Sequence, residues 1–136
     1  MFTVSREFSF CYGHRLLNYD GKCSHLHGHN ARVQIMLRGD GLDDDGMLFD
    51  FNKFKITIGE WIDKNFDHRV ILCENDPLVK LLLQINEPVY ILPYNPTAEN
   101  LAKEIFERCQ FLNLPIVSVK FWETDKCNAE FNLISK

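Results

Sequence analysis

Four of the five histidines lie before residue 30, and three of them have the spacing of a metal site. Alternating apolar residues predict a strand over residues 2–12, and His14 continues its apolar face. A second strand is predicted over residues 30–38, and its apolar face is continued backward by His29 and His27. Histidines two residues apart on a strand share a face and can hold one ion together. A third histidine from the neighbouring strand completes a three-histidine site with one open position, the arrangement of catalytic zinc.

These three histidines also have a plainer interpretation, as hydrogen-bonded core residues or solvent-exposed side chains. We favour the metal site because His27, Gly28 and His29 form one short motif that is in phase with His14. Zinc is preferred to redox iron, since no carboxylate has an evident place beside the imidazoles. His25 has the same parity as His27 but falls in the polar loop predicted over residues 16–26.

Glu123 and Cys23 are two further candidates for chemistry. In the strand predicted over residues 116–123, Glu123 extends the apolar face formed by the odd-numbered positions. A buried carboxylate needs a partner or a ligand, so Glu123 either meets one or emerges into solvent at the strand end. Cys23 follows Lys22 and precedes the histidines, where a neighbouring cation or metal favours the thiolate, the form that acts as base or nucleophile.

Other polar residues give weaker signals. The pair Asp67 and His68 can form a carboxylate-oriented imidazole, although adjacent Asp-His pairs are common on protein surfaces. Phosphate groups require basic side chains, and the sequence does not choose among the candidates Arg15, Lys22, Arg32 and Lys53. Five widely spread cysteines without a C-x-x-C pair make a poor disulfide framework. Apart from Cys23, the cysteines are expected to pack as small hydrophobic residues.

Six elements are needed to position these residues. An amphipathic helix is predicted over residues 51–64 with Asp50 as its N-cap, and a second helix begins after Pro96 with Thr97 as its N-cap. The final strands are predicted over 116–123 and 127–134, joined by a tight polar turn. Residues 67–96 give weaker signals, a short helix through Leu83 and an extended piece over 89–92. The order strand, strand, helix, helix, strand, strand indicates an α+β fold, an antiparallel sheet covered by helices.

Length and composition bound the function. The 136 residues suit a single domain over 1–136, with a hydrophobic content of 46% that supports a core. A formal net charge of −4 argues against a broad nucleic-acid surface. No stretch approaches the roughly 20 apolar residues of a membrane helix. The first residues have no apolar signal core, so we expect a cytoplasmic protein without a membrane or nucleic-acid partner.

Taken together, the motifs resemble the 6-pyruvoyltetrahydropterin synthase / 6-carboxytetrahydropterin synthase family. The resemblance covers nearly the whole chain, with the motifs in family order. The matching segments are Phe10-Cys11-Tyr12-Gly13-His14-Arg15, Lys22-Cys23-Ser24-His25-Leu26-His27-Gly28-His29-Asn30, Gly46-Met47-Leu48-Phe49-Asp50-Phe51, Asp67-His68, Asn95-Pro96-Thr97-Ala98-Glu99-Asn100 and Glu123-Thr124.

The resemblance implies a fold and a set of site roles. The fold is the tunnelling fold, a four-stranded antiparallel sheet with two helices on one face. Its subunits form homo-oligomers, usually hexamers, with the active site at a subunit interface. The implied roles are zinc ligation by His14, His27 and His29, general-base catalysis by Cys23, relay by Asp67 and His68, and pterin binding by Glu123 with Thr97 and Glu99.

The implied substrate is 7,8-dihydroneopterin triphosphate. One branch of the family forms 6-carboxytetrahydropterin, acetaldehyde and triphosphate, on the way to queuosine, and the other eliminates triphosphate to form 6-pyruvoyltetrahydropterin. The spacing from Cys23 to His29 resembles the carboxy-forming branch, and a non-catalytic pterin- or zinc-binding relative is the third alternative. Two departures could mark a subgroup: Cys11-Tyr12-Gly13 in place of a small Ala-Ala pair, and a long connection over 67–96.

Overall fold

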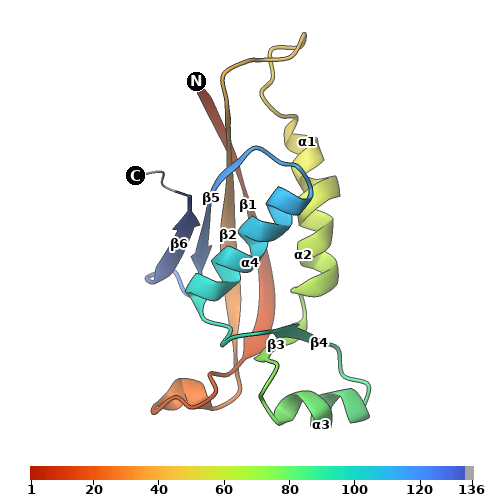
Figure 1. The fold of residues 1–136 in the computed structure, drawn as a ribbon, viewed down its shortest axis with the longest axis vertical. Coiled ribbons are helices and arrows are strands. Elements are labelled where there is room, and N and C mark those ends of the chain that lie inside the picture. Colours follow the sequence, from red (N-terminus) through yellow and green to blue (C-terminus); the bar gives the residue numbers. More distant parts are fainter. Residues whose placement is uncertain (134–136) are drawn as a thin grey trace.

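The computed structural model describes residues 1–133, which form a six-stranded mixed sheet with helices against one face (Figure 1). In chain order the elements are β1 (Phe2–His14), the 3-10 turn η1 (Lys22–Ser24), β2 (His27–Gly39), α1 (Phe51–Phe54), the π-helical segment η2 (Lys55–Gly59), α2 (Glu60–Asn65), β3 (Arg69–Cys73), α3 (Leu78–Gln84), β4 (Val89–Leu92), α4 (Ala98–Phe111), β5 (Ile116–Trp122) and β6 (Asn128–Asn132). The end predicted for the last strand, Ile134, lies outside the described residues.

Four of the strands form the antiparallel sheet that the sequence predicts. The spatial order is β4-β3-β1-β2-β5-β6, and the pairs β1–β2, β2–β5 and β5–β6 are antiparallel. The β1–β2 ladder runs without a break from Phe2 opposite Gly39 to His14 opposite His27. Both strands therefore extend beyond their predicted ends, and they carry the histidine-bearing segments into the sheet.

The predicted strand count is wrong, because β3 and β4 add two strands at one edge of the sheet. β3 pairs in parallel with β1, from Tyr12 opposite Arg69 to His14 opposite Ile71, and β4 pairs in parallel with β3. The run in β3 is only five residues long and buries its last three side chains in succession. Short strands buried on both faces lack the alternation that identifies a half-buried strand, so their pairing is decided by tertiary contacts.

The helices begin where the sequence predicts. The Asp50 carboxylate accepts a hydrogen bond from the Asn52 N–H, and the Thr97 hydroxyl accepts one from the Asn100 N–H. Such caps satisfy backbone donors that have no partner inside the helix. The first helix is continuous over 51–65 but has a π-helical turn at its centre. There Gly59 packs on β1, since a Cβ at this position would lie 2.8 Å from a ring carbon of Phe8.

The core lies between the sheet and the helices α1–α2 and α4, which cover the same face of the sheet (Figure 1). Odd-numbered residues of β2 pack here, as the alternation predicts, together with the apolar stripes of the helices. The short helix α3 has no buried residue and lies apart from this layer. Over residues 1–133, no helix combines the length and apolar character needed to cross a membrane.

An ion pair fixes the chain immediately after β1. The Arg15 guanidinium donates through Nε and Nη2 to the two carboxylate oxygens of Asp76, with Nε 2.8 Å from Oδ2. The Leu78 N–H donates to the same carboxylate. The Asp76 side chain is fully buried, and its hydrogen bonds with Arg15 hold the pKa of Asp76 below its ordinary value. This pairing uses the Nε–Nη2 edge of the Arg15 guanidinium, so that edge is unavailable to a phosphate group.

Replacing Asp76 by asparagine is expected to lower the free energy of unfolding by about 1–3 kcal/mol at pH 7, the scale of a hydrogen bond to a charged group. Because the folded pKa is depressed, the stabilisation is present above the unfolded pKa of about 3.9 and is lost as pH falls through the folded value. Urea unfolding at pH 7 and at successively lower pH tests this. The gap between wild type and Asp76→Asn should shrink below about pH 4. A gap that stays constant with pH would show that the carboxylate charge is not its cause.

Candidate functional site

Three imidazoles meet where β1 ends and β2 begins. His14 is opposite His27 in the ladder, and His29 is opposite Tyr12. His14 is buried, with 2% of its surface exposed, and His27 and His29 are half-buried. One ring nitrogen from each of the three lies within 4.8 Å of the others. The cluster therefore contains three potential metal ligands from two adjacent strands.

In two of these rings, a hydrogen bond determines which ring nitrogen is free to bind a metal. Nδ1 of His14 lies 2.7 Å from the Pro96 carbonyl oxygen, and Nδ1 of His27 lies 2.7 Å from the His25 carbonyl oxygen. A carbonyl can only accept, so both Nδ1 atoms carry hydrogen and both Nε2 atoms present a lone pair. Metal-bound histidines commonly use this arrangement, in which the second ring nitrogen donates to a carbonyl oxygen.

The spacing and protonation of the rings suit a cation. Nε2 of His14 and Nε2 of His29 are 3.1 Å apart, close to the separation of about 3.3 Å between two nitrogens on a tetrahedral zinc ion. Burial lowers the pKa of His14 to about 4, and burial with the nearby His27 also lowers the pKa of His29. Both rings are therefore neutral near pH 7, so neither has to release a proton when a metal binds.

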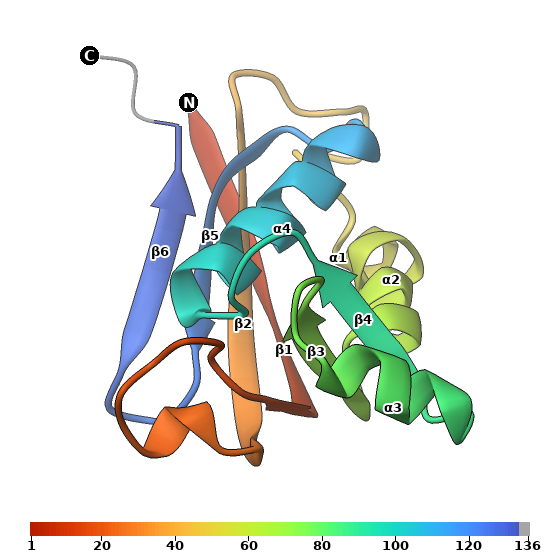
Figure 2. The same ribbon diagram turned by 60° about the horizontal axis from the view of Figure 1, so that its bottom comes forward.

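A cavity of about 230 Å³ adjoins the cluster and is lined by His14. Its other lining residues come from the β1–β2 connection, the start of α4 and the turn after β5. They include four of the polar residues singled out in the sequence, namely Cys23, Thr97, Glu99 and Glu123. Figure 2 shows the β1–β2 connection at this end of the molecule, near the first turn of α4.

Glu123 directly follows β5 and lines this cavity. Its Oε1 lies 3.9 Å from Nε2 of His14, and the side chain is 27% exposed. The expectation that no carboxylate lies beside the imidazoles is therefore wrong, because the residue after β5 brings one to them. Burial, followed by the negative charge of Glu99, raises the pKa of Glu123. Tyr12 packs beside the imidazoles, and its hydroxyl is buried with no hydrogen-bond partner among the described residues. Glu123 thus gives the cavity an acceptor that a bound ligand could satisfy, whereas Tyr12 is not among the residues that line it.

Cys23 lines the cavity because hydrogen bonds at Leu16, Leu17 and Cys23 fix the conformation of the β1–β2 connection. The Leu16 N–H donates to the Cys23 carbonyl oxygen over 2.8 Å. The Asn95 side chain accepts from the Leu17 N–H and donates to the Leu17 carbonyl oxygen, over 2.8 and 3.0 Å. Cys23 itself lies in the 3-10 turn η1 and is half-buried. Asn95 was not identified as a site residue by sequence reasoning, since its role depends on a contact 78 residues away.

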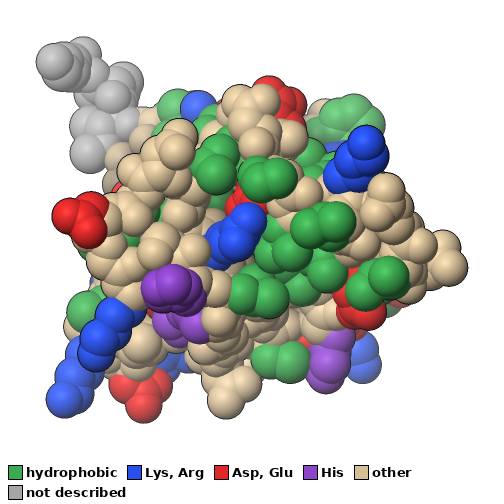
Figure 3. All heavy atoms as spheres, turned by 90° about the horizontal axis from the view of Figure 1, so that it is seen from below, with side chains coloured by type: hydrophobic (Ala, Val, Ile, Leu, Met, Phe, Trp, Pro, Cys, Tyr) green, Lys and Arg blue, Asp and Glu red, His purple; other side chains and the backbone are tan. Residues whose placement is uncertain are grey.

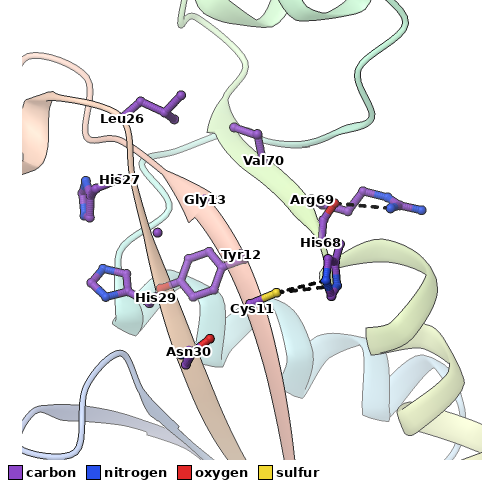
Figure 4. Close-up of a pocket in the computed structure, with 11 residues that line it drawn as sticks. Cys11, Tyr12, Gly13, Leu26, His27, His29, Asn30, His68, Arg69 and Val70 are labelled. Carbon is purple, nitrogen blue, oxygen red and sulfur yellow. Dashed lines mark hydrogen bonds between the residues drawn. The ribbon is translucent and has the colours of Figure 1, made fainter.

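Asp67 and His68 are not in this cavity within the chain. They contact Cys11, and His68 lines a different, more open hollow of about 470 Å³. Figure 4 shows the Cys11 sulfur and the His68 ring on one side of the β1–β2 ladder and the rings of His27 and His29 on the other. Strand alternation accounts for this separation, because Cys11 is odd-numbered on β1 whereas Tyr12 and His14 are even-numbered.

The remaining predicted residues lie outside the cluster. The Arg32 guanidinium stacks 4.1 Å from the Trp122 ring centre and lies near Glu7. Lys22 belongs to η1, and Lys53 is an exposed residue of α1. Cysteine packing was predicted correctly for Cys73 and Cys109, which are buried. It was wrong for Cys127, which is exposed, and Cys11 is only half-buried.

Comparison with known proteins identifies relatives over almost the full length. A family model described as 6-pyruvoyl tetrahydropterin synthase matches residues 3–133. The 6-carboxy-5,6,7,8-tetrahydropterin synthase of Rickettsia bellii is 34% identical, covering 96% of this chain and 99% of the relative. The Haemophilus influenzae protein of the same name is 33% identical with the same coverage of both chains.

Solved structures agree with these matches. An uncharacterized protein from Wolinella succinogenes superposes with a TM-score of 0.82 at 27% identity, covering 96% of this chain and 97% of the other. The 6-pyruvoyl tetrahydropterin synthase of Caenorhabditis elegans gives a TM-score of 0.73 at 26% identity, with coverages of 98% and 96%. The family model, the relatives and the fold thus agree, and the chain belongs to the 6-pyruvoyl tetrahydropterin synthase family.

Proposed function

We propose that the protein is a zinc-dependent lyase that converts 7,8-dihydroneopterin triphosphate to 6-carboxy-5,6,7,8-tetrahydropterin, acetaldehyde and triphosphate. The observation that carries the proposal is the cavity in which Cys23 and Glu123 adjoin the three-imidazole cluster. The curated relatives named 6-carboxy-5,6,7,8-tetrahydropterin synthase support the choice of product. The three residues between Cys23 and His27 also match that branch.

Zinc is the metal that best fits the donor set of His14, His27 and His29. Three imidazoles with an open fourth position are the ligand set of catalytic zinc. When bound, zinc would supply positive charge that polarises the hydroxyl oxygens of the substrate side chain. The hydrogen bonds from His14 and His27 to backbone carbonyl oxygens would keep the ligating nitrogens oriented.

Cys23 is proposed as the general base that removes a proton from the carbon beside the metal-held hydroxyl. A thiolate is suited to this step, and Cys23 lines the same cavity as His14. Asp67 and His68 are proposed to relay the proton, with Nδ1 of His68 hydrogen-bonded to Oδ1 of Asp67 over 2.9 Å. Since this pair faces Cys11 in its own chain, the relay would act on Cys23 of a second copy, consistent with a proposed hexameric homo-oligomer.

Glu123 is proposed to hold the guanidine-like edge of the pterin, with Thr97 and Glu99 beside it at the start of α4. Its carboxylate can accept two parallel hydrogen bonds from such an edge. Replacing Glu123 by glutamine puts an N–H group against a donor, so affinity for 7,8-dihydroneopterin should fall by about 1–3 kcal/mol.

Titration of pterin fluorescence with Glu123→Gln measures this loss. Glu130→Gln on the exposed side of β6 is the matched control, because it removes the same charge outside the cavity. An unchanged dissociation constant in Glu123→Gln would remove Glu123 from the pterin site.

Product analysis tests the proposed reaction. The protein carrying one equivalent of zinc per chain is incubated with 7,8-dihydroneopterin triphosphate, and the products are identified by mass spectrometry. Acetaldehyde together with 6-carboxytetrahydropterin is the expected result. The second candidate is elimination of triphosphate to give 6-pyruvoyltetrahydropterin, which the likeness to the Caenorhabditis elegans enzyme favours. Zinc binding without turnover would contradict both and indicate a pterin- or metal-binding relative.

A further inference from the structure

A second group of metal-ligand side chains lies on the opposite face of the β1–β2 ladder from the imidazole cluster. It consists of the Cys11 thiol, the Asp67 carboxylate and the His68 imidazole, with one donor atom from each within 4.8 Å of the others. Sγ of Cys11 is 3.5 Å from Nδ1 of His68 and 3.9 Å from Oδ1 of Asp67. Histidine side chains accordingly appear at two separate places on the lower end of the molecule (Figure 3).

The backbone holds this group in place by two hydrogen bonds in opposite directions. The His68 N–H donates to the Cys11 carbonyl oxygen over 2.7 Å, and the Cys11 N–H donates to Oδ1 of Asp67 over 3.2 Å. His68 adopts a left-handed backbone conformation with φ of 58°. Such a conformation costs a non-glycine residue free energy, so the surrounding contacts must maintain it. The three side chains are thereby preorganised, although 56 residues separate Cys11 from Asp67.

The donor spacing resembles the edges of a metal tetrahedron. Bond lengths of about 2.3 Å to sulfur and about 2.0–2.1 Å to nitrogen and oxygen place tetrahedral donors roughly 3.3–3.6 Å apart. The three separations here are 3.5, 3.9 and 2.9 Å, the last between Nδ1 of His68 and Oδ1 of Asp67. We propose that Cys11, Asp67 and His68 form a second metal site that takes Zn²⁺ or Co²⁺, with a fourth position that none of these three side chains fills.

Binding at this site changes the protonation of its ligands. The Cys11 thiol loses its proton to solvent, and the thiolate sulfur bonds to the metal. The imidazole of His68 ligates through Nδ1, so its proton moves to Nε2. The hydrogen bond between Nδ1 of His68 and Oδ1 of Asp67 is replaced by two bonds to the metal. A filled site therefore withdraws Asp67 and His68 from proton transfer, a consequence that rests on the proposed function, whereas metal binding itself does not.

Cobalt titration of the metal-free full-length protein tests the site. A cobalt–thiolate bond gives a charge-transfer absorption in the near ultraviolet that imidazole ligands alone do not give. We expect two equivalents of Co²⁺ to bind per chain, with this absorption growing as the second equivalent binds. Cys11→Ala should abolish the absorption and lower the affinity for the second equivalent by at least about 10-fold. Even the loss of an outer-shell partner of a metal ligand lowers metal affinity by about this factor.

Three further variants identify the metal ligands: two remove other thiols, and one removes the His68 imidazole. Cys23→Ala and Cys127→Ala remove the two thiols that line the other cavity, and both should retain the charge-transfer absorption. His68→Asn keeps a residue that tolerates the left-handed backbone and should weaken the second equivalent without unfolding the chain. A single equivalent in the wild type, or an absorption lost with Cys23 instead of Cys11, would overturn the proposal. Neither result bears on the products formed from the pterin, so the proposed function is tested separately.

Discussion

A Cys23→Ala variant is expected to retain its zinc at the imidazole cluster and to lose roughly 10²–10⁴-fold in kcat, the usual contribution of a general base. The proposed zinc ligands are ring nitrogens of His14, His27 and His29, so removing the thiol leaves them intact. KM should change little, because Glu123 and the start of α4 still line the cavity. Steady-state kinetics and metal analysis of the same preparation measure both effects.

Ser24→Ala is the matched control for this prediction. Ser24 lies next to Cys23 in the 3-10 turn η1, and its hydroxyl donates to the Gly21 carbonyl oxygen over 2.6 Å. Its loss disturbs the same turn without removing the thiol, so kcat should remain within a few-fold of wild type. If Cys23→Ala instead keeps full turnover, Cys23 is not the base. If both variants lose activity equally, the geometry of the turn accounts for the effect.

The second large effect concerns His27. His27→Ala should weaken zinc binding at the imidazole cluster by more than about 100-fold, because loss of even an outer-shell partner of a metal ligand costs about 10–100-fold. Removing one of three ring nitrogens also leaves His14 and His29 with their Nε2 atoms 3.1 Å apart and no third imidazole. Chelator competition in a Cys11→Ala background measures this affinity without interference from the second site.

His25→Ala provides the control, because His25 is a histidine two residues from His27 that lies outside the cluster. The His25 backbone carbonyl accepts from Nδ1 of His27, and this contact survives removal of the side chain. Zinc affinity should therefore match wild type. Undiminished zinc binding by His27→Ala would reject the three-histidine site. Weakened binding by His25→Ala would instead show that the His25 imidazole contributes to zinc binding.

Strand alternation predicts the meeting of His14, His27 and His29 because it is a local rule that continues along an unbroken ladder. β1 and β2 pair up to His14 and His27, so the parity of the apolar residues extends to the imidazoles. The caps at Asp50 and Thr97 are local as well, and each depends on a backbone N–H two or three residues away. These features needed no information about distant parts of the chain.

Contacts between distant residues could not be predicted in this way. Arg15 pairs with Asp76, and Cys11 contacts Asp67, through separations of 61 and 56 residues that no periodicity encodes. The parallel strand β3 creates the second contact by aligning with the end of β1. Parity could have placed Cys11 on the face opposite Tyr12, but only the pairing of β3 brings a carboxylate and an imidazole to that face.

The two ends of the β1–β2 connection are anchored independently, with a consequence for how this family can diverge. Leu17 is held by the side chain of Asn95, while His27 is held by strand pairing with His14. Residues inserted between Cys23 and His27 would lengthen the tether of the thiol and leave the imidazoles in register. The position of the proposed base relative to the proposed metal site can thus vary through loop length alone, so that one imidazole framework would suit reactions that stop at different products.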